Sequence, residues 1–400
     1  MCGTFNPRKW GQYPPEAPSS HRLVAKDTTL SRWVHGFESR WECNKVRVVI
    51  NKVRIYTGSM IGFCCKWLDH ESQINGIGNK EAARALSTWG TTVAWLNRQT
   101  VDVAEQRLWD MMEFNIESIR LLVERVGALK PEKRMVRLGS DLLGVYTEAH
   151  WRYFYQRSDV QDYCAKHFRV VGDLARKLGV RLSFHPGHFT VLSSGDPDII
   201  RRSVEEFEYH CDMIRWMGYG VEFQDFKCNI HISGPLGAQG VIDALKIMSP
   251  EARNSLTIEN GEIGWGIDES LKLVDHCALV IDVHHHWVRT GEYLEPDDAR
   301  VRRVMDSWRG VRPVIHYSQP RKELLVDHDP DVQPDMDALL AQGFSRVKFR
   351  AHSDFYWNQA NNRWVSRFLP EFDVQTESKA KNLARDFLVE DLKSFNLITV

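Results

Sequence analysis

Histidine, aspartate and glutamate recur in this chain at the ends of short apolar segments. In residues 279–287, a run of Leu, Val and Ile ends in Asp282 and the three histidines His284, His285 and His286. An apolar run of this kind is typical of a parallel strand, and a carboxylate buried at its end costs free energy unless a partner compensates. Imidazole and carboxylate together suit zinc, manganese or iron. A hydrogen-bonded polar cluster or an exposed His-rich loop would also explain this one segment.

Five further apolar segments end in a residue that can bind a metal. Their closing residues are, in chain order, His185, His231, Glu259, His316 and Glu377. Singly, each would more often be a hydrogen-bonded structural residue. In a (β/α)8 barrel, however, all strand ends open on one rim, where barrel active sites lie. We therefore predict an oxygen-and-nitrogen cage for two or three divalent ions, which suits phosphodiester cleavage and equally suits sugar isomerisation.

The elements that must position these residues alternate along the chain. Strands are expected at residues 60–65, 135–142, 180–187, 228–234, 255–260, 279–287, 312–319 and 372–378. Helical patterns separate them, most clearly over residues 101–126 and from Pro197, capped by Asp196, to Gly218. Eight strands alternating with helices in one pass predict an α/β fold, the (β/α)8 TIM barrel. A doubly wound sheet is the alternative, but no glycine-rich phosphate loop follows the first strand.

Composition narrows the class of protein. The 400 residues are 43% hydrophobic with a formal net charge of −1, which allows one large core and gives no global sign of a polyanionic partner. No apolar run is long enough to span a bilayer, and we see no signal peptide. Eight scattered cysteines without a CxxC pair favour reduced thiols and argue against a cysteine-ligated zinc.

Two regions stand apart from the barrel pattern. Residues 1–59 carry ten Lys or Arg against four Asp or Glu. They predict either a basic tail that binds DNA or an extension before a functional start at Met60. Residues 320–350 form an insertion with its own helix expected at 336–342. We therefore predict one catalytic domain over residues 60–400, preceded by a basic extension that does not belong to the core.

Five segments resemble those of the UV damage endonucleases. They are Phe184-His185-Pro186-Gly187, Ile258-Glu259-Asn260, residues 281–286, His316-Tyr317-Ser318 and Arg350-Ala351-His352-Ser353-Asp354. The resemblance covers about residues 60–390. It implies a barrel of the endonuclease IV and xylose isomerase-like type, and a metal-dependent DNA repair hydrolase. Such an enzyme nicks the backbone 5′ of UV photoproducts, meaning cyclobutane dimers and 6-4 products, with abasic sites as a further candidate.

The same resemblance implies partners and ligands. The partner would be double-stranded DNA with UV lesions, and the protein a monomer, cytoplasmic or, in a eukaryote, nuclear, without membrane association. Two or three ions are expected, with manganese as the metal and zinc or magnesium as alternatives. The implied ligands are His185, His231 and a bridging Glu259 for one ion, and Glu259, Asp282, His316 and Glu377 for a second.

A third ion would lie with His285 and His352. Spacing alone does not separate His285 from its two neighbours, but the family's Asp-x-x-His match selects it. His328, in the insertion, competes with His352. Among the catalytic residues, Glu259 and Asp282 would hold ions and Lys379 would approach a phosphate.

Candidate DNA contacts come from the same comparison of motifs. After His-Pro-Gly this chain has His188-Phe189 where the family usually has Gln-Tyr, so Phe189 is the predicted wedge at the lesion. The alternative is that Phe189 packs under its own loop, in which case Phe63 or the aromatic segment 66–100 would contact the lesion. Arg137 fits a family pattern on strand two and either contacts DNA or is paired internally. Some relatives carry a lysine two residues before the strand-seven histidine, where this chain has Val314.

Three other functions remain open at this point. An abasic-site endonuclease would use the same metals without a preference for photoproducts. A metal-dependent sugar isomerase or epimerase would show a small closed pocket rather than an open groove. A non-catalytic DNA-binding barrel is disfavoured because the set of predicted ligands is complete.

Overall fold

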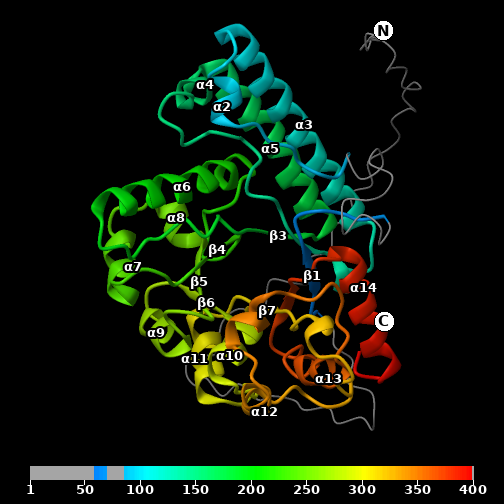
Figure 1. The fold of residues 1–400 in the computed structure, drawn as a ribbon. Helices are drawn as coiled ribbons and strands as arrows, with labels where there is room; N and C mark the ends of the chain where they lie inside the picture. The colour runs from blue at the N-terminus through cyan, green and yellow to red at the C-terminus, as the bar shows by residue number, and fades with distance from the viewer. Residues whose placement is uncertain (1–57, 70–84, 399–400) are drawn as a thin grey trace, which may run out of the picture. The chain divides into compact units, whose positions relative to one another are not determined.

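Eight parallel strands close into a barrel in sequence order (Figure 1). In the computed structural model, which describes residues 58–69 and 85–398, the strands are β1 Ile61–Cys64, β2 Met135–Arg137, β3 Arg181–Phe184, β4 Lys227–His231, β5 Leu256–Glu259, β6 Ala278–Asp282, β7 Val314–Tyr317 and β8 Asp373–Thr376. Each pairs with the next, and β8 pairs with β1. The predicted TIM barrel is confirmed. The predicted basic extension lies almost entirely outside the described residues.

Helices alternate with the strands. They are α2 Val93–Leu96, α3 Val101–Gly127, α4 Arg152–Gln156, α5 Ser158–Leu178, α6 Pro197–Trp216, α7 Gly237–Leu245, α8 Pro250–Ser255, α9 Ile267–Ser270, α10 Val283–Thr290, α11 Ala299–Ser307, α12 Met336–Ala341, α13 Gln359–Ser366 and α14 Lys381–Ser394, with 3-10 turns η2 Pro131–Lys133, η3 Leu271–Leu273, η4 Lys322–Leu324 and η5 Arg346–Arg350. The long α3 and α5 lie side by side (Figure 1). None of these helices is both long and apolar enough to cross a bilayer.

The start and end of α6 follow the predicted signals. The Asp196 side chain accepts a hydrogen bond from the backbone N–H of Asp198 at 2.8 Å, and Pro197 occupies the first turn. At the other end Gly218 has φ +77°, and its N–H donates to the carbonyl of Arg215. Asp196 and Pro197 fix where α6 begins. They therefore also fix the length of the loop between β3 and α6, which carries His185 and Phe189.

The histidine run lies on a helix and not on a strand. β6 ends at Asp282 and α10 begins at Val283, so the expectation of a strand through residue 287 is wrong. The Asp282 carboxylate accepts a hydrogen bond from the backbone N–H of His285 at 2.7 Å and caps α10. Helical geometry then sends three consecutive imidazoles in three directions, where a strand would have alternated them between two faces.

The barrel holds apolar side chains, neutral polar side chains and a partly buried ion pair between Arg181 on β3 and Asp373 on β8. At one level Ala278, Val280 and Val314 pack with Trp308 in a small core. The large core lies outside the barrel, where strand residues such as Ile281 and Ile315 meet the helices. Buried polar residues also occur on the strands, including Ser183, Asn229, Thr257 and Gln375. A barrel filled in this way leaves its carboxyl end free for a polar site.

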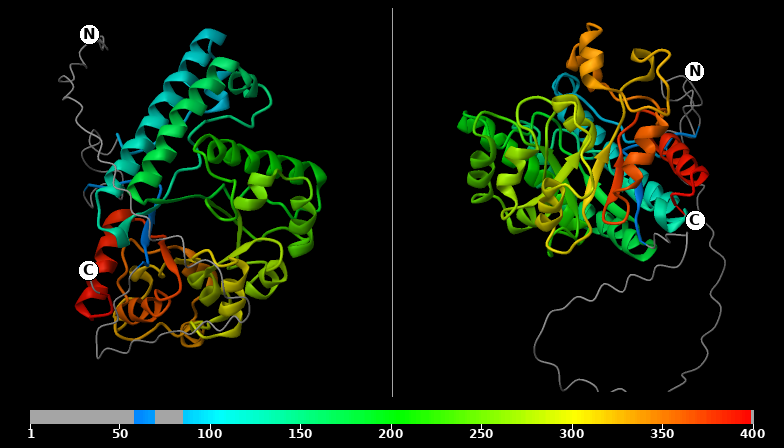
Figure 2. Two further views of the ribbon diagram at one scale, coloured as in Figure 1. Left: turned by 180° about the vertical axis from the view of Figure 1, so that it is seen from behind. Right: turned by 90° about the horizontal axis from the view of Figure 1, so that it is seen from below.

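The insertion at 320–350 has a small core of its own. Its members, including residues from α10, are Trp287, Val288, Leu325, Met336, Leu339 and Phe349. The predicted helix is present as α12, in the orange segment that projects beyond the barrel in Figure 2. Pro320 and His352 form an antiparallel bridge, and the N–H of Ser353 donates to the carbonyl of Gln319. The insertion therefore leaves and re-enters the fold at one point, beside the end of β7.

Candidate metal centre

Strand register brings the predicted ligands to one level of the rim. His231 on β4 is in register with Glu259 on β5, and Asp282 on β6 with His316 on β7. Three groups each place a donor atom from every member within 4.8 Å of the others: His185, His231 and Glu259; Glu259, Asp282 and His285; and Asp282, His316 and Glu377. The first group is the set expected for one ion. The other two groups differ from the expected sets. His285, expected at the third ion, groups with Glu259 and Asp282, and the group of Asp282, His316 and Glu377 lacks Glu259.

Several atoms at this centre that could bind a metal are buried without a hydrogen-bond partner. They are Oε1 of Glu259, Oδ2 of Asp282 and Nδ1 of His316. Nδ1 of His316 lies 3.0 Å from Oε2 of Glu259 and 3.2 Å from Oε1 of Glu377. Unpaired buried carboxylate oxygens are costly unless a cation satisfies them. The residues present therefore fit divalent ions.

Electrostatics at the centre favour neutral imidazole ligands. Burial lowers the pKa of His231 to about 3 and that of His316 to about 4, so both are neutral at neutral pH. Burial alone would raise the pKa of Glu259, but His316, His231, His185 and His285 hold it well below its usual range. Burial raises the pKa of Asp282 well above its usual range. Burial alone would lower the pKa of His285, but Asp282 and Glu259 hold it well above its usual range. The buried carboxylates thus attract positive charge, which His231 and His316 do not supply.

The three consecutive histidines have three different partners. Nδ1 of His285 lies 3.2 Å from Oε1 of Glu259. Nε2 of His284 lies 2.8 Å from the carbonyl oxygen of Phe349, in the insertion. Nε2 of His286 lies 3.0 Å from Glu292. Of the three, His285 alone joins the candidate metal centre.

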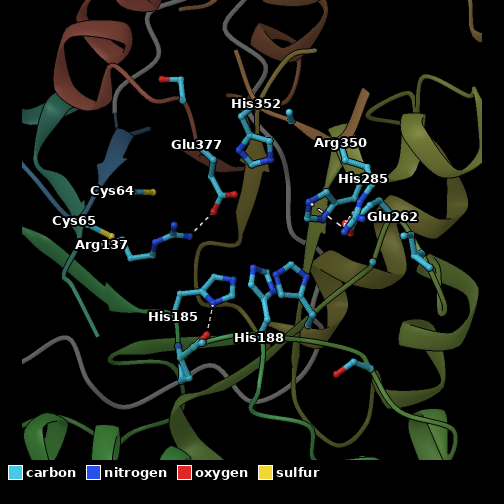
Figure 3. A pocket seen from close by; sticks show the side chains of 18 of the residues that line it. Cys64, Cys65, Arg137, His185, His188, Glu262, His285, Arg350, His352 and Glu377 are labelled. Atoms are coloured by element: carbon cyan, nitrogen blue, oxygen red, sulfur yellow. Dashed lines mark hydrogen bonds and ion pairs between the residues drawn. The ribbon is translucent and has the colours of Figure 1, made fainter. Parts of the chain in front are cut away.

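His185, His231, His285 and Glu377 of the centre line a pocket of about 850 Å³, and Glu259 and His316 lie behind them, in contact with His185 and Glu377. Figure 3 shows Cys64, Cys65 and Arg137 on one side of this pocket and Glu262 and Arg350 on another. Arg137 forms an ion pair with Glu377, which is the internal pairing left open by the sequence. Lys379 also lines the pocket and pairs with Asp354 at 3.2 Å, while its side chain stays 45% exposed.

Comparison with protein-family models identifies the family of this chain. The model described as UV-endonuclease UvdE matches residues 79–400. The chain belongs to the UV-endonuclease UvdE family.

Individual UvdE relatives are distant in sequence. The chain is 24% identical over 307 residues to the UV DNA damage endonuclease of Bacillus cereus (strain Q1), a match that covers 72% of this chain and 84% of that protein. It is 26% identical over 197 residues to the UV-damage endonuclease of Neurospora crassa, covering 42% and 30%. The solved structure of SacUVDE superposes with a TM-score of 0.62 at 18% identity, covering 85% of this chain and 100% of that one, which supports the fold.

The structure of this UvdE-family chain adds two residues that the sequence did not single out. Nζ of Lys227, on β4, lies 2.8 Å from Nε2 of His316, and Asn229 donates a hydrogen bond to Oε2 of Glu259. Lys227 is buried, with 3% exposure. A lysine inside a strand segment that reads Lys-Cys-Asn-Ile-His was an available signal, because buried lysines need a partner. The position of Val314 on β7 is apolar, and the buried cation beside His316 comes from β4 instead.

The predicted DNA contacts of this UvdE-family chain have different locations. His188 lies at the pocket, its ring 4.9 Å from that of His231, and Phe189 beside it is 70% exposed. A Cβ on Gly187 would approach the Phe189 ring to 2.4 Å, so the ring lies directly on the Gly187 backbone. The expectation for Phe63 needs correction. Phe63 is fully buried in the main core against Trp67, because it points outward from β1 toward the helices.

The structure also distinguishes between His352 and His328, the two candidate ligands of the third ion. The ring of His352 lies at the pocket, 6.2 Å from that of His285, but His352 belongs to none of the three donor groups found among the described residues. His328 lies in the insertion, where Nε2 is 2.9 Å from the carbonyl oxygen of Val332. His328 does not line the pocket, so His352 is the better placed of the two.

Proposed function

We propose that this UvdE-family chain is a metal-dependent hydrolase that nicks duplex DNA on the 5′ side of UV photoproducts, leaving a 3′-hydroxyl and a 5′-phosphate. The observation that carries the proposal is the cluster of buried ligand atoms without a hydrogen-bond partner on Glu259, Asp282 and His316, next to the pocket-lining residues His185, His285 and Glu377. Family membership and the activities named for the relatives support UV-damaged DNA as substrate. Manganese is the proposed metal, with zinc and magnesium as alternatives.

Three of the proposed ligands, Glu259, Asp282 and His316, are held in place before DNA arrives. Asn229 donates to Glu259, the start of α10 holds Asp282, and Lys227 contacts His316. Divalent ions bound at these ligands would activate water and offset the negative charge that develops on the phosphoryl oxygens. Because the ligands come from several strands and are already ordered, little reorganisation is needed when substrate binds.

Two cationic side chains at the pocket, Lys379 and Arg137, are candidates for contact with the phosphates of the DNA backbone. Lys379 can exchange its exposed ion pair with Asp354 for a phosphate oxygen at little cost, since exposed pairs contribute little free energy. Arg137 is already committed to Glu377 and lies deeper, with 15% of its side chain exposed. We therefore assign phosphate contact to Lys379, and to Arg137 the role of holding Glu377.

Phe189 is the proposed wedge at the lesion. An exposed aromatic ring fixed on the Gly187 backbone is already in position to enter a base step. A damaged step is weakly stacked, so it opens at lower cost than an intact one. His188, between Phe189 and His231, places this wedge next to the proposed metals.

A nicking assay tests the function. Three duplexes would be compared, one with a single defined pyrimidine dimer, one with an abasic site and one undamaged, each with manganese and with a chelator. We expect cleavage 5′ of the dimer that the chelator abolishes, and little cleavage of undamaged DNA. Cleavage of the abasic duplex alone would favour an abasic-site endonuclease, and cleavage of none would reject the proposal.

A further inference from the structure

Two segments far apart in sequence are joined at the edge of the pocket. The loop after β5, residues 261–265, is closed by a hydrogen bond from the N–H of Gly261 to the carbonyl of Trp265, and Trp265 Nε1 donates to Gly234. Glu262 in this loop accepts a hydrogen bond from Nε of Arg350, in η5, at 2.7 Å. The β5 loop and the end of the insertion therefore form one surface.

This surface is rigidly supported. Phe349 of η5 is fully buried in the insertion core, and Arg346 donates to the carbonyl of Val288 at 3.0 Å. Although its base is fixed, the surface exposes two aliphatic side chains, Ile263 at 57% and Val347 at 62%, and both line the pocket. Single exposed aliphatic residues need no explanation, but two on a braced rim beside a candidate active site indicate a contact surface.

Cations accompany these aliphatic side chains. Lys348, next to the pocket-lining Val347, is exposed just outside the pocket; its Nζ lies 5.9 Å from the centroid of the Phe344 ring, and within residues 58–69 and 85–398 it forms no ion pair with a carboxylate. Lys379 and Lys381 line the same pocket. The carboxylate of Glu377 lines the pocket and those of Glu259 and Asp282 are buried behind the lining, so the lysines lie at the edge and the carboxylates lie deeper. Positive charge beside apolar surface matches a nucleic-acid strand, which presents phosphates next to the flat faces of bases and sugars.

We propose that Ile263, Val347 and Lys348 form a second DNA-contact surface, here called the lip, which holds the strand next to the lesion. The proposal rests on the proposed function and assigns a role to the 320–350 insertion. Ile263 and Val347 contact base or deoxyribose faces, and Lys348 contacts a phosphate. The row His188, His231 and His285, with ring centroids 4.9 Å and 5.4 Å apart, links the loop of Phe189 to this lip. DNA is thus held from two sides of the metal centre.

Single-turnover nicking of the dimer duplex tests the apolar part of the lip. Ile263→Ser with Val347→Ser should raise the protein concentration needed for half-maximal rate by about tenfold, while the maximal rate, the metal content and the Tm stay unchanged. Val326→Ser is the matched control, because Val326 is 74% exposed in the same insertion and does not line the pocket. A double variant that behaves like Val326→Ser would overturn the proposal.

The charged part of the lip has its own test. Lys348→Ala should reduce the slope of log affinity against log salt by about one, because one fewer counterion is released on binding. Lys322→Ala is the control, since Lys322 is also exposed in the insertion but neither of its sequence neighbours lines the pocket, whereas Val347 beside Lys348 does. Equal slopes for the two variants would contradict the contact with phosphate. If the unmodified chain nicks none of the duplexes, the proposed function fails; if it nicks normally and the lip variants do too, only the lip fails.

Discussion

At the scale of single residues, Asp282 and Glu259 of the candidate centre each have a structural role in addition to the proposed binding of metal. Asp282 caps α10 with one carboxylate oxygen and leaves the other unpaired toward His316 and Glu377. Glu259 accepts a hydrogen bond from Asn229 with one oxygen and directs the other toward Nδ1 of His285, 3.2 Å away. This division fixes the orientation of each carboxylate, which is what a metal ligand needs before its ion arrives.

Phe189→Ala tests the lesion contact at this scale. Loss of the ring should reduce the ratio of nicking rates on dimer and intact duplex by about tenfold, because stacking of a base on an aromatic side chain contributes about 1–3 kcal/mol. Metal content and Tm should hardly change, since the ring is 70% exposed. Phe387→Ala, at a 48% exposed phenylalanine on α14, is the control. A large fall in Tm with selectivity intact would instead make Phe189 a packing residue.

Residue-scale prediction from sequence worked where a strand end or a motif marked the position. His185, His231, Glu259, Asp282, His316 and Glu377 were selected because each follows an apolar run, and the barrel brings them together. Lys227 was missed because its partner, His316, is 89 positions away and no local spacing links them. Phe63 was misplaced because alternation on a four-residue strand does not reveal which face is the interior.

At the scale of elements, local signals set most boundaries. The caps of α6 and the period of α3 were readable from sequence, since both depend on neighbouring residues. The start of α10 was not, because β-forming Val and Ile run directly into a helix N-cap without a turn residue. That abrupt change is what separates His285 from His284 and His286.

Helix α6 also contains a buried histidine that couples stability to pH. His210 is fully buried, and burial lowers its pKa to about 4 from an ordinary value of 6.5. Below about pH 6.5 this histidine binds a proton in the unfolded chain but not in the folded chain. The free energy of unfolding therefore falls as the pH drops toward 4. From pH 7 to pH 5 this residue should remove about 2 kcal/mol.

Denaturant unfolding of chelated protein at pH 7 and pH 5 measures this effect. His210→Phe keeps a ring in contact with Phe184 and Tyr209 but has no titrating group, so its loss of stability over this range should be smaller by that amount. The exposed His276→Gln is the control. Identical pH dependence in the His210 variant and in the unmodified chain would show that His210 is not responsible.

At the scale of the whole molecule, the barrel explains why residues spread over nearly two hundred positions meet. Parallel strands closed in sequence order put every carboxyl end on one rim, so the order of ligands along the chain becomes their order around the site. The sequence predicted this because strands and helices alternate in one pass. It did not predict that the insertion would supply part of the pocket edge, since Glu262 and Arg350 are 88 positions apart.

Deletion of residues 2–57 tests how much of the chain the function requires. The strands that close the barrel begin at Ile61, and β1 pairs with β2 and β8. We therefore expect the shortened chain to nick the dimer duplex at the same rate and with the same salt dependence. A clear fall in affinity with a flatter salt dependence would show instead that the basic extension binds DNA.

Glu259→Gln tests the central claim most directly, when bound metal per chain and nicking rate are measured on the same preparation. The substitution keeps the volume but removes the carboxylate shared by two of the three donor groups. We predict loss of bound metal together with a fall in nicking rate of more than about a hundredfold. Glu323→Gln, in the exposed part of the insertion, should change neither. Full metal content with near-normal nicking in Glu259→Gln would contradict the account.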